Sequence, residues 1–271
     1  MTTTDYLTQL TKDRQDLVDN LETKGISGLS GDETFTELVP EVLNIPSGGG
    51  AWEVPDGTLF MGSTWENAPL LDTHNVTNAY RMFQNCTKMK TISQLDTSNI
   101  TNMRQMFSGC SVLGSVPNLN VSSCSSFSGM FDTCLGLENI ELSNSTCSSN
   151  STYFSEMFAN CENLKSAILP ALGQVGEGVN CQKMFHDCRL LETVDLSNFN
   201  PVSFKNTSYM FYNCWALREL DISSMTVFPN DNFDNMFYSV PGNCLILVKD
   251  QNAVDWFTTN FPTMTNVQIK N

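Results

Sequence analysis

Cysteine is the residue type with the most chemical potential in this chain of 271 residues, which holds ten cysteines but only two histidines, His74 and His186. Ten cysteines can indicate a disulfide framework, metal sites or buried thiols. Structural zinc sites need closely spaced ligand pairs, yet no two cysteines are separated by only two residues, and neither histidine lies in a cluster with them. The sequence therefore favours buried thiols and predicts no metal and no cofactor. Disulfides between neighbouring repeats stay geometrically possible.

Carboxylates are the second group that could do chemistry. Six of them fall between the apolar positions of the predicted strands: Glu138, Glu141, Glu192, Asp195, Glu219 and Asp221. Paired carboxylates can hydrolyse glycosides, and such a row can attract a cationic partner or a divalent ion. Their regular placement favours a solvated acidic face that keeps the fold soluble. Because the sequence also shows no set of nucleophile and base, we expect that the protein is not an enzyme.

Aromatic residues form the third group: Tyr209, Tyr212, Trp215 and Tyr238. They occupy repeat positions that other copies fill mainly with polar residues, so we expect them to form one exposed patch. Exposed aromatic groups often bind protein or sugar. Coverage by the terminal cap or by a second subunit of a homo-oligomer is the alternative explanation for the patch, and incidental exposure is a third.

An internal repeat must position these groups. The dipeptide Met-Phe occurs seven times, at spacings of 24 to 27 residues, beginning at Met82, Met106, Met130, Met157, Met184, Met210 and Met236. In the first six copies a cysteine follows the Phe by three positions, and Leu or Met follows the cysteine by three. This period lies in the range of leucine-rich repeats. Six copies in strict register predict a solenoid.

Each repeat must bury its apolar side against the next one, so equivalent residues should form columns along the stack. The segment that follows each cysteine predicts a short strand with alternate side chains directed inward. The Met-Phe segment predicts one or two helical turns on the opposite side, which makes the expected fold class an α/β repeat solenoid. The Phe column should dominate stability, and the repeated cysteines should be a packing column.

The repeat resembles a known family. Residues 194–214 and 95–107 are similar to the BspA-like leucine-rich repeats of bacterial surface proteins, which are marked by LDLSxFDTSNVTNMxxMFxxC, and the resemblance covers about residues 58–248. The first two full copies lack two residues of this motif around the strand, and the seventh lacks the cysteine. The resemblance implies a BspA-type solenoid with terminal caps, and a surface for adhesion or recognition.

The two ends differ from the middle. Residues 1–45 predict a small helical module for attachment or oligomerisation, because leucines recur along residues 5–24 and a capping signal opens a second apolar segment at Ser30. Residues 46–50 predict a Gly-rich linker, residues 51–244 the solenoid, and residues 245–271 a C-terminal cap of strand, helix and strand. The pattern of residues 10–39 is also similar to an N-terminal segment of tail and baseplate proteins from phages that infect Gram-positive bacteria.

Charge and hydropathy limit the partners and the location. The formal net charge of −15 disfavours nucleic acid and anionic membranes, which are bound mainly through clustered Lys and Arg. No apolar run approaches membrane-spanning length, so we expect no membrane insertion, and no secretory signal is visible at the amino terminus. These observations favour a phage virion protein. Residues 1–45 would contact other virion proteins, and the solenoid would bind a protein or glycan of the bacterial surface. A bacterial cell-surface adhesin is the alternative.

Overall fold

The structure is a computed structural model that describes residues 52–53, 57, 60–68, 71–92, 94–143, 146–147, 153–172, 178–199, 201, 204–224 and 232–270. The chain divides into two compact units, Met1–Trp52 and Glu53–Asn271. The predicted helical module and linker, residues 1–50, lie outside the described residues and stay predictions. The second unit contains the repeats.

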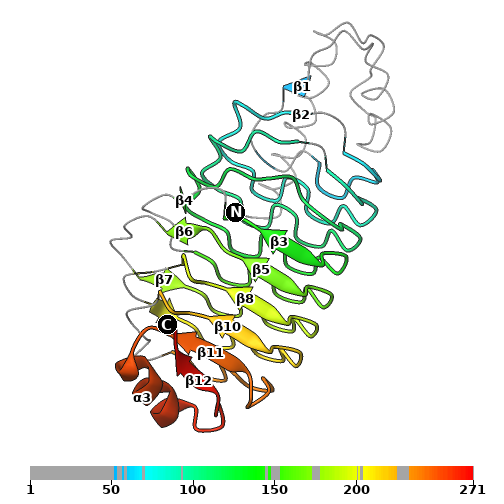
Figure 1. Cartoon of the computed structure of the whole chain (residues 1–271). Helices are drawn as coiled ribbons and strands as arrows, with labels where there is room; N and C mark the ends of the chain where they lie inside the picture. The colour runs from blue at the N-terminus through cyan, green and yellow to red at the C-terminus, as the bar shows by residue number, and fades with distance from the viewer. Residues whose placement is uncertain are drawn as a thin grey trace, which may run out of the picture. The chain divides into compact units, whose positions relative to one another are not determined.

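Parallel strands stacked one coil upon the next form one side of the second unit (Figure 1). The largest sheet runs in the order β3, β5, β8, β10, β11, β12, with bounds Asn139–Glu141, Ser166–Ile168, Thr193–Asp195, Glu219–Asp221, Leu245–Val248 and Val267–Ile269. Equivalent residues pair across every step: Ile140 with Ala167, Ala167 with Val194, and so on. These inward side chains are buried. The strands predicted after the repeat cysteines are therefore confirmed from β3 onward.

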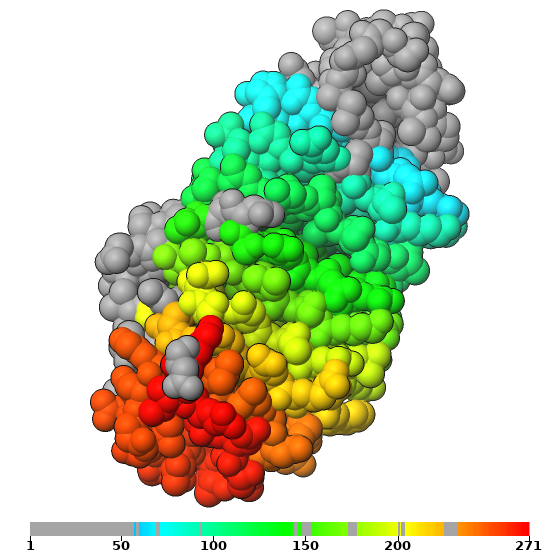
Figure 2. Space-filling view, in the orientation of Figure 1, coloured from blue at the N-terminus to red at the C-terminus, as the bar shows by residue number. Residues whose placement is uncertain are grey.

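Shorter pairings link other parts of successive coils. β1 (Trp52–Glu53) pairs with β2 (Leu71–Asp72), β4 (Thr146–Cys147) with β6 (Ala171–Leu172), and β7 (Val179–Asn180) with β9 (Phe204–Asn206). Isolated parallel bridges connect further coils, as between Asn78 and Asn102. In the space-filling view the colours of the second unit follow chain order (Figure 2). Each coil thus packs on its neighbours in sequence, which is the arrangement of a solenoid.

The Met-Phe segments are successive turns, and the prediction that they are helical is wrong. In the coil of Met130, the backbone N–H groups of residues 129, 131 and 133 donate to the carbonyls of residues 155, 157 and 159 in the next coil. The N–H groups of the residues between them close turns within their own coil, each onto the carbonyl three residues earlier. Half of the donors therefore join neighbouring coils, whereas an α-helix would use all of them internally.

The backbone conformation explains why no helix forms there. The residue before each Met has a φ of 53–62°, and the second residue after each Phe a φ of 58–76°. Both values lie in the left-handed region of backbone conformation, and a right-handed helix cannot contain residues in that region. The second position is held by Asn, Asp or Gly in five of seven copies, the types that tolerate this region best. The solenoid is therefore mostly strand and turn, and its one described α-helix lies in the cap.

Eight phenyl rings form the central column of the core. They stack at centroid separations of 5.3–5.6 Å with interplanar angles of at most 15°. Phe60 is the first of them and extends the column one coil before the first Met-Phe pair. Trp65 packs on Phe60 at 4.8 Å, and Phe261 meets Phe237 edge-on at 4.9 Å. Aromatic rings thus close both ends of the column. Burying each phenyl contributes roughly 1.5–3 kcal/mol.

The six repeat cysteines are buried and free, as predicted for a packing column. Each thiol also donates to the carbonyl of the column Phe in the preceding coil at 3.0–3.2 Å; Cys134 reaches Phe107 in this way, and Cys161 reaches Phe131. In five of the six cases that carbonyl also accepts the N–H of the cysteine in its own coil, and the carbonyl of Phe60 accepts the N–H of Ser63 instead. Burial raises the pKa of the Cys161 thiol to about 12. Burial also raises the pKa of Cys134, Cys188 and Cys214, so these thiols serve as neutral hydrogen-bond donors between coils. In Cys86, at the first coil, hydrogen bonds from Cys110 and Ser63 lower the thiol pKa to about 7 instead.

The C-terminal cap has the predicted order of strand, helix and strand. The helix α3 (Gln251–Asn260) begins after Asp250, whose side chain accepts the N–H of Ala253 at 3.1 Å. Its buried Phe257 faces the end of the phenyl column at Phe237. β12 then returns parallel to β11. Among the described residues, no helix is long and apolar enough to cross a membrane.

Candidate binding surface

Three aromatic side chains stack on the outside of consecutive coils. The rings of His186 and Tyr212 lie 4.9 Å apart at 8°, and those of Tyr212 and Tyr238 lie 4.9 Å apart at 12°. Tyr209 lies beside them, with its ring 5.5 Å from that of Tyr212 and 6.4 Å from that of His186. We call these four residues the ring ladder. Tyr238 is 55% exposed, and the other three are partly exposed.

The spacing of the coils creates the ladder. His186, Tyr212 and Tyr238 each follow the column Phe by one position, so their rings repeat with the same step as the buried phenyls. Earlier coils hold Gln84, Ser108, Asp132 and Ala159 at this position. The sequence prediction brought the three tyrosines together correctly. It did not include His186, although His186 stands in the same repeat column as Tyr212 and Tyr238. That shared position could have identified it.

Trp215 belongs to a separate part of the surface. Its side chain is 53% exposed, and within the described part of the chain it makes no ring contact with the tyrosines predicted to be its neighbours. The guanidinium of Arg189 lies over its ring instead, 5.3 Å from the centroid. Arg189 is also held by Glu162 at 3.4 Å. We call Trp215 and Arg189 the Trp platform. Arg189 was not among the site residues predicted from the sequence.

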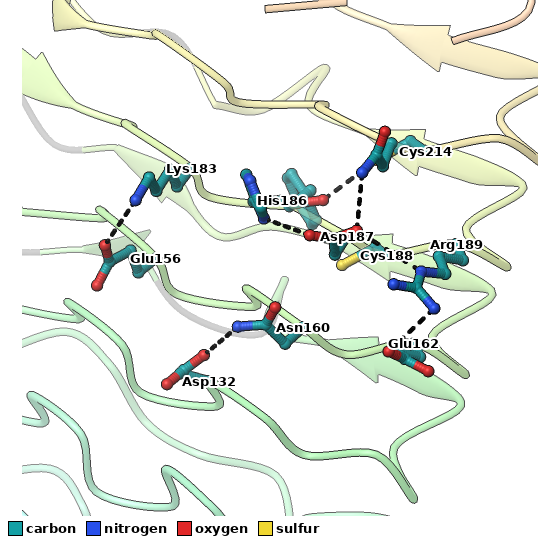
Figure 3. Close-up of polar contacts among 12 residues, drawn as sticks. Asp132, Glu156, Asn160, Glu162, Lys183, His186, Asp187, Cys188, Arg189 and Cys214 are labelled. Atoms are coloured by element: carbon teal, nitrogen blue, oxygen red, sulfur yellow. Dashed lines mark hydrogen bonds and ion pairs between the residues drawn. The ribbon is translucent and has the colours of Figure 1, made fainter. Parts of the chain in front are cut away.

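Asp187 connects the ring ladder to the Trp platform (Figure 3). Its carboxylate lies 2.8 Å from Nδ1 of His186 and 3.6 Å from Nε of Arg189, and it accepts Nδ2 of Asn213 at 2.9 Å. Its side chain is only 16% exposed, so these partners satisfy an acid that is largely removed from water. One carboxylate therefore positions the first ring of the ladder and the cation on Trp215.

The cationic side chains around these rings are paired with carboxylates. Lys183 faces Glu156 at 3.9 Å (Figure 3), and both charges act on the imidazole of His186. Burial lowers the pKa of His186 below its usual 6.5, against the opposing effect of Asp187. The imidazole is therefore mostly neutral at pH 7. Within the described residues no side chain hydrogen-bonds the hydroxyls of Tyr209, Tyr212 or Tyr238, which leaves three groups that can both donate and accept.

The predicted acidic face is not continuous. Glu138 pairs with Lys165 at 2.7 Å, and Glu192 pairs with Arg218, in each case across one coil step. Asp221 is buried and pairs with Lys270 of the cap. The remaining three behave differently: Glu141 accepts a hydrogen bond from Ser143, Asp195 accepts the N–H of Ser197, and Glu219 is exposed. The acidic face was predicted from the residues of each strand alone. The cationic partners that interrupt it lie in neighbouring coils.

No group of three or more His, Cys, Asp or Glu side chains that could hold a metal ion occurs among the described residues. The surface offers ring faces, hydroxyls and paired charges, held on a regular scaffold. Such a surface can bind a ligand through stacking and hydrogen bonds.

Comparison with known proteins agrees with the repeat architecture. No curated protein matches the chain. Residues 59–171 and 149–244 match the family described as "Mycoplasma protein of unknown function, DUF285", and together these matches span most of the solenoid. The chain therefore belongs to the DUF285 family.

Proposed function

We propose that this protein is a recognition module whose solenoid presents the ring ladder and the Trp platform to a partner on a bacterial surface. One observation carries the proposal. The inner columns repeat nearly the same residue in every coil, whereas one outer column changes from small or polar residues to rings in three consecutive coils only. Exposed aromatic rings gathered at one place on a repetitive scaffold are typical of binding sites.

The repeats are of the BspA-like leucine-rich type in this proposal. The supporting facts are the motif itself, its period and the DUF285 match over nearly the same residues. The resemblance implies adhesion, and the arrangement of Asp187, His186 and Arg189 supplies a preorganised surface for it.

Two settings fit this activity. In the first, residues 1–45 form a helical module that joins the protein to a phage tail or another part of a virion, as the resemblance of residues 10–39 suggests. In the second, the protein is an adhesin on a bacterial cell, which the Mycoplasma name of the family favours. Deleting residues 1–45 separates the two: loss of incorporation into phage particles supports the virion setting, and unchanged incorporation contradicts it.

Binding of the full chain to bacterial cells tests the recognition function. Fluorescently labelled protein is incubated with wall-bearing Gram-positive cells and with wall-less mycoplasma cells, and the bound fraction is measured after sedimentation. We expect Tyr212→Ala with Tyr238→Ala to abolish binding. Tyr153→Ala is the matched control, because Tyr153 is 53% exposed but lies outside the ladder. Equal binding by the wild type and the ladder variant would refute the proposal, and so would no binding to either cell type.

A further inference from the structure

The ring ladder exposes edges rather than faces along most of its length. Because the rings stack on one another with small interplanar angles, Tyr212 has both faces covered, by His186 on one side and Tyr238 on the other. Its hydroxyl and ring edge remain for a ligand. The outer face of Tyr238 has no ring upon it among the described residues, and Tyr238 is 55% exposed. A ligand can therefore contact the hydroxyl-bearing edges of the tyrosine rings and, at the end of the row, the uncovered face of Tyr238.

Electrostatics disfavour an anionic ligand. Lys183, His186 and Arg189 all have carboxylate partners, so the surface presents no cation without a counter-ion within the described residues. The chain as a whole carries a formal charge of −15. Polyanions bind through clustered, available Lys and Arg, and these are missing from this surface.

The step of the ladder disfavours an extended peptide. Successive rings lie 4.9 Å apart, whereas a β-strand advances about 3.3 Å per residue and alternates its side chains between two faces. Side chains of an extended peptide would therefore fall out of register with the hydroxyl edges. A pyranose ring is comparable in length to one coil step, and it offers both an apolar face for stacking and hydroxyls for hydrogen bonds.

We infer that the ring ladder and the Trp platform bind a neutral glycan chain. The hydroxyls of Tyr212 and Tyr238 would hydrogen-bond successive sugars, and the open face of Tyr238 and the exposed ring of Trp215 would stack on pyranose rings. Asp187 is a positioning residue, since it holds His186 and Arg189 without facing the ligand itself. This inference rests on the proposed recognition function and names the ligand class of the same surface.

Titration of the full chain with neutral oligosaccharides tests the inference. The probes are the β-1,4-linked tetramer of N-acetylglucosamine, cellotetraose and maltotetraose, with heparin as a polyanion, and binding is followed by calorimetry. We expect at least one neutral tetramer to bind, with an affinity that changes little with salt. Trp215→Ala should weaken it at least about tenfold, as for an aromatic hot spot. Tyr238→Phe should weaken it less, because only the hydroxyl is lost.

Controls separate failure of this inference from failure of the proposed function. Tyr153→Ala should bind like the wild type, and Asp187→Asn should weaken binding while leaving the circular dichroism spectrum unchanged. Absence of binding to all three neutral tetramers, or preference for heparin, overturns the glycan assignment. If cell binding still depends on the ladder, the recognition function survives that result. Self-association of the full chain that the ladder variant abolishes would instead identify a second copy as the occupant.

Discussion

The buried phenyl column and the exposed ring ladder both follow the spacing of successive coils, but they differ in length and in exposure to water. Both place aromatic rings on successive coils, with centroids 5.3–5.6 Å apart inside and 4.9 Å apart outside. The inner column continues through eight coils and loses almost all contact with water. The ladder spans three coils and stays partly exposed. Uniform repetition therefore marks a stabilising column, and a local departure from it marks a specialised surface.

The difference also concerns what holds each ring. The inner rings are fixed by burial, and cysteine thiols tie six of the eight Phe carbonyls to the next coil. The outer rings are held by one another and by side chains such as Asp187. Truncating an inner ring should therefore cost stability, and truncating an outer ring should cost binding.

Removing an inner ring should have the largest effect. Phe131→Ala leaves a cavity between Phe107 and Phe158, so the free energy of unfolding should fall by about 3–5 kcal/mol. Chemical denaturation followed by circular dichroism measures the change. A loss below about 1 kcal/mol would mean that neighbouring coils collapse into the gap, and that the column is less rigid than its stacking implies.

Substitutions at the second position after the column Phe, where the backbone is left-handed, should have the next largest effect on stability. Thr133 has a φ of 60°, which is unfavourable for a β-branched residue, so Thr133→Asn should raise the free energy of unfolding by about 0.5–1 kcal/mol. The reverse change, Asn160→Thr, should lower it by about 1–2 kcal/mol, because it also removes the hydrogen bond from Nδ2 of Asn160 to Asp132. Changes of the same sign in both variants would contradict this reading of the backbone.

Truncating the ladder should cost little stability. Tyr212→Ala with Tyr238→Ala removes exposed stacking worth about 1 kcal/mol, well below the expected cost of Phe131→Ala. The same denaturation experiment measures it. A loss of about 3 kcal/mol or more would place the ladder with the structural columns and remove the contrast between the two regions.

Protonation of His186 should give the smallest effect. Its pKa in the folded protein lies below the unfolded value of 6.5, so between these two values the unfolded chain binds more protons. The free energy of unfolding should therefore decline as the pH falls below about 6.5, starting from its full value above that pH. His186→Gln should remove this part of the pH dependence, and the control His74→Gln should retain it. An identical pH profile for wild type and His186→Gln would contradict the direction of the shift.

The repeat register could be predicted because side chains of one type return at one spacing. That spacing correctly placed the strands β3, β5, β8 and β10 and the cysteine column. It did not separate a helix from successive turns, because both return side chains to one face after three or four residues. The recurrence of Asn at positions 85, 160 and 213 could have indicated turns, because Asn tolerates the left-handed backbone conformation that these residues adopt.

The candidate surface was predicted only in part. Three tyrosines were predicted because aromatic residues replace mainly polar ones in their columns. His186 and Arg189 stand in the columns of Tyr212 and Trp215, but the predicted patch left them out. The acidic row failed similarly, because Lys165 and Arg218 neutralise it from neighbouring coils. Contacts between coils combine residues that lie more than twenty positions apart, and such contacts are visible only after the columns are aligned.

The sequence by itself determined the solenoid, its period and its inner columns, because a strict repeat that buries the same side chains in every coil admits essentially one way of stacking. The tertiary structure alone decided that half of the backbone donors in the Met-Phe turns cross between coils. It also decided that a single carboxylate, that of Asp187, joins the ladder to the Trp platform. The physical reason is that hydrogen bonds and ring contacts between coils depend on distances of a few ångströms, which residue spacing along the chain does not specify.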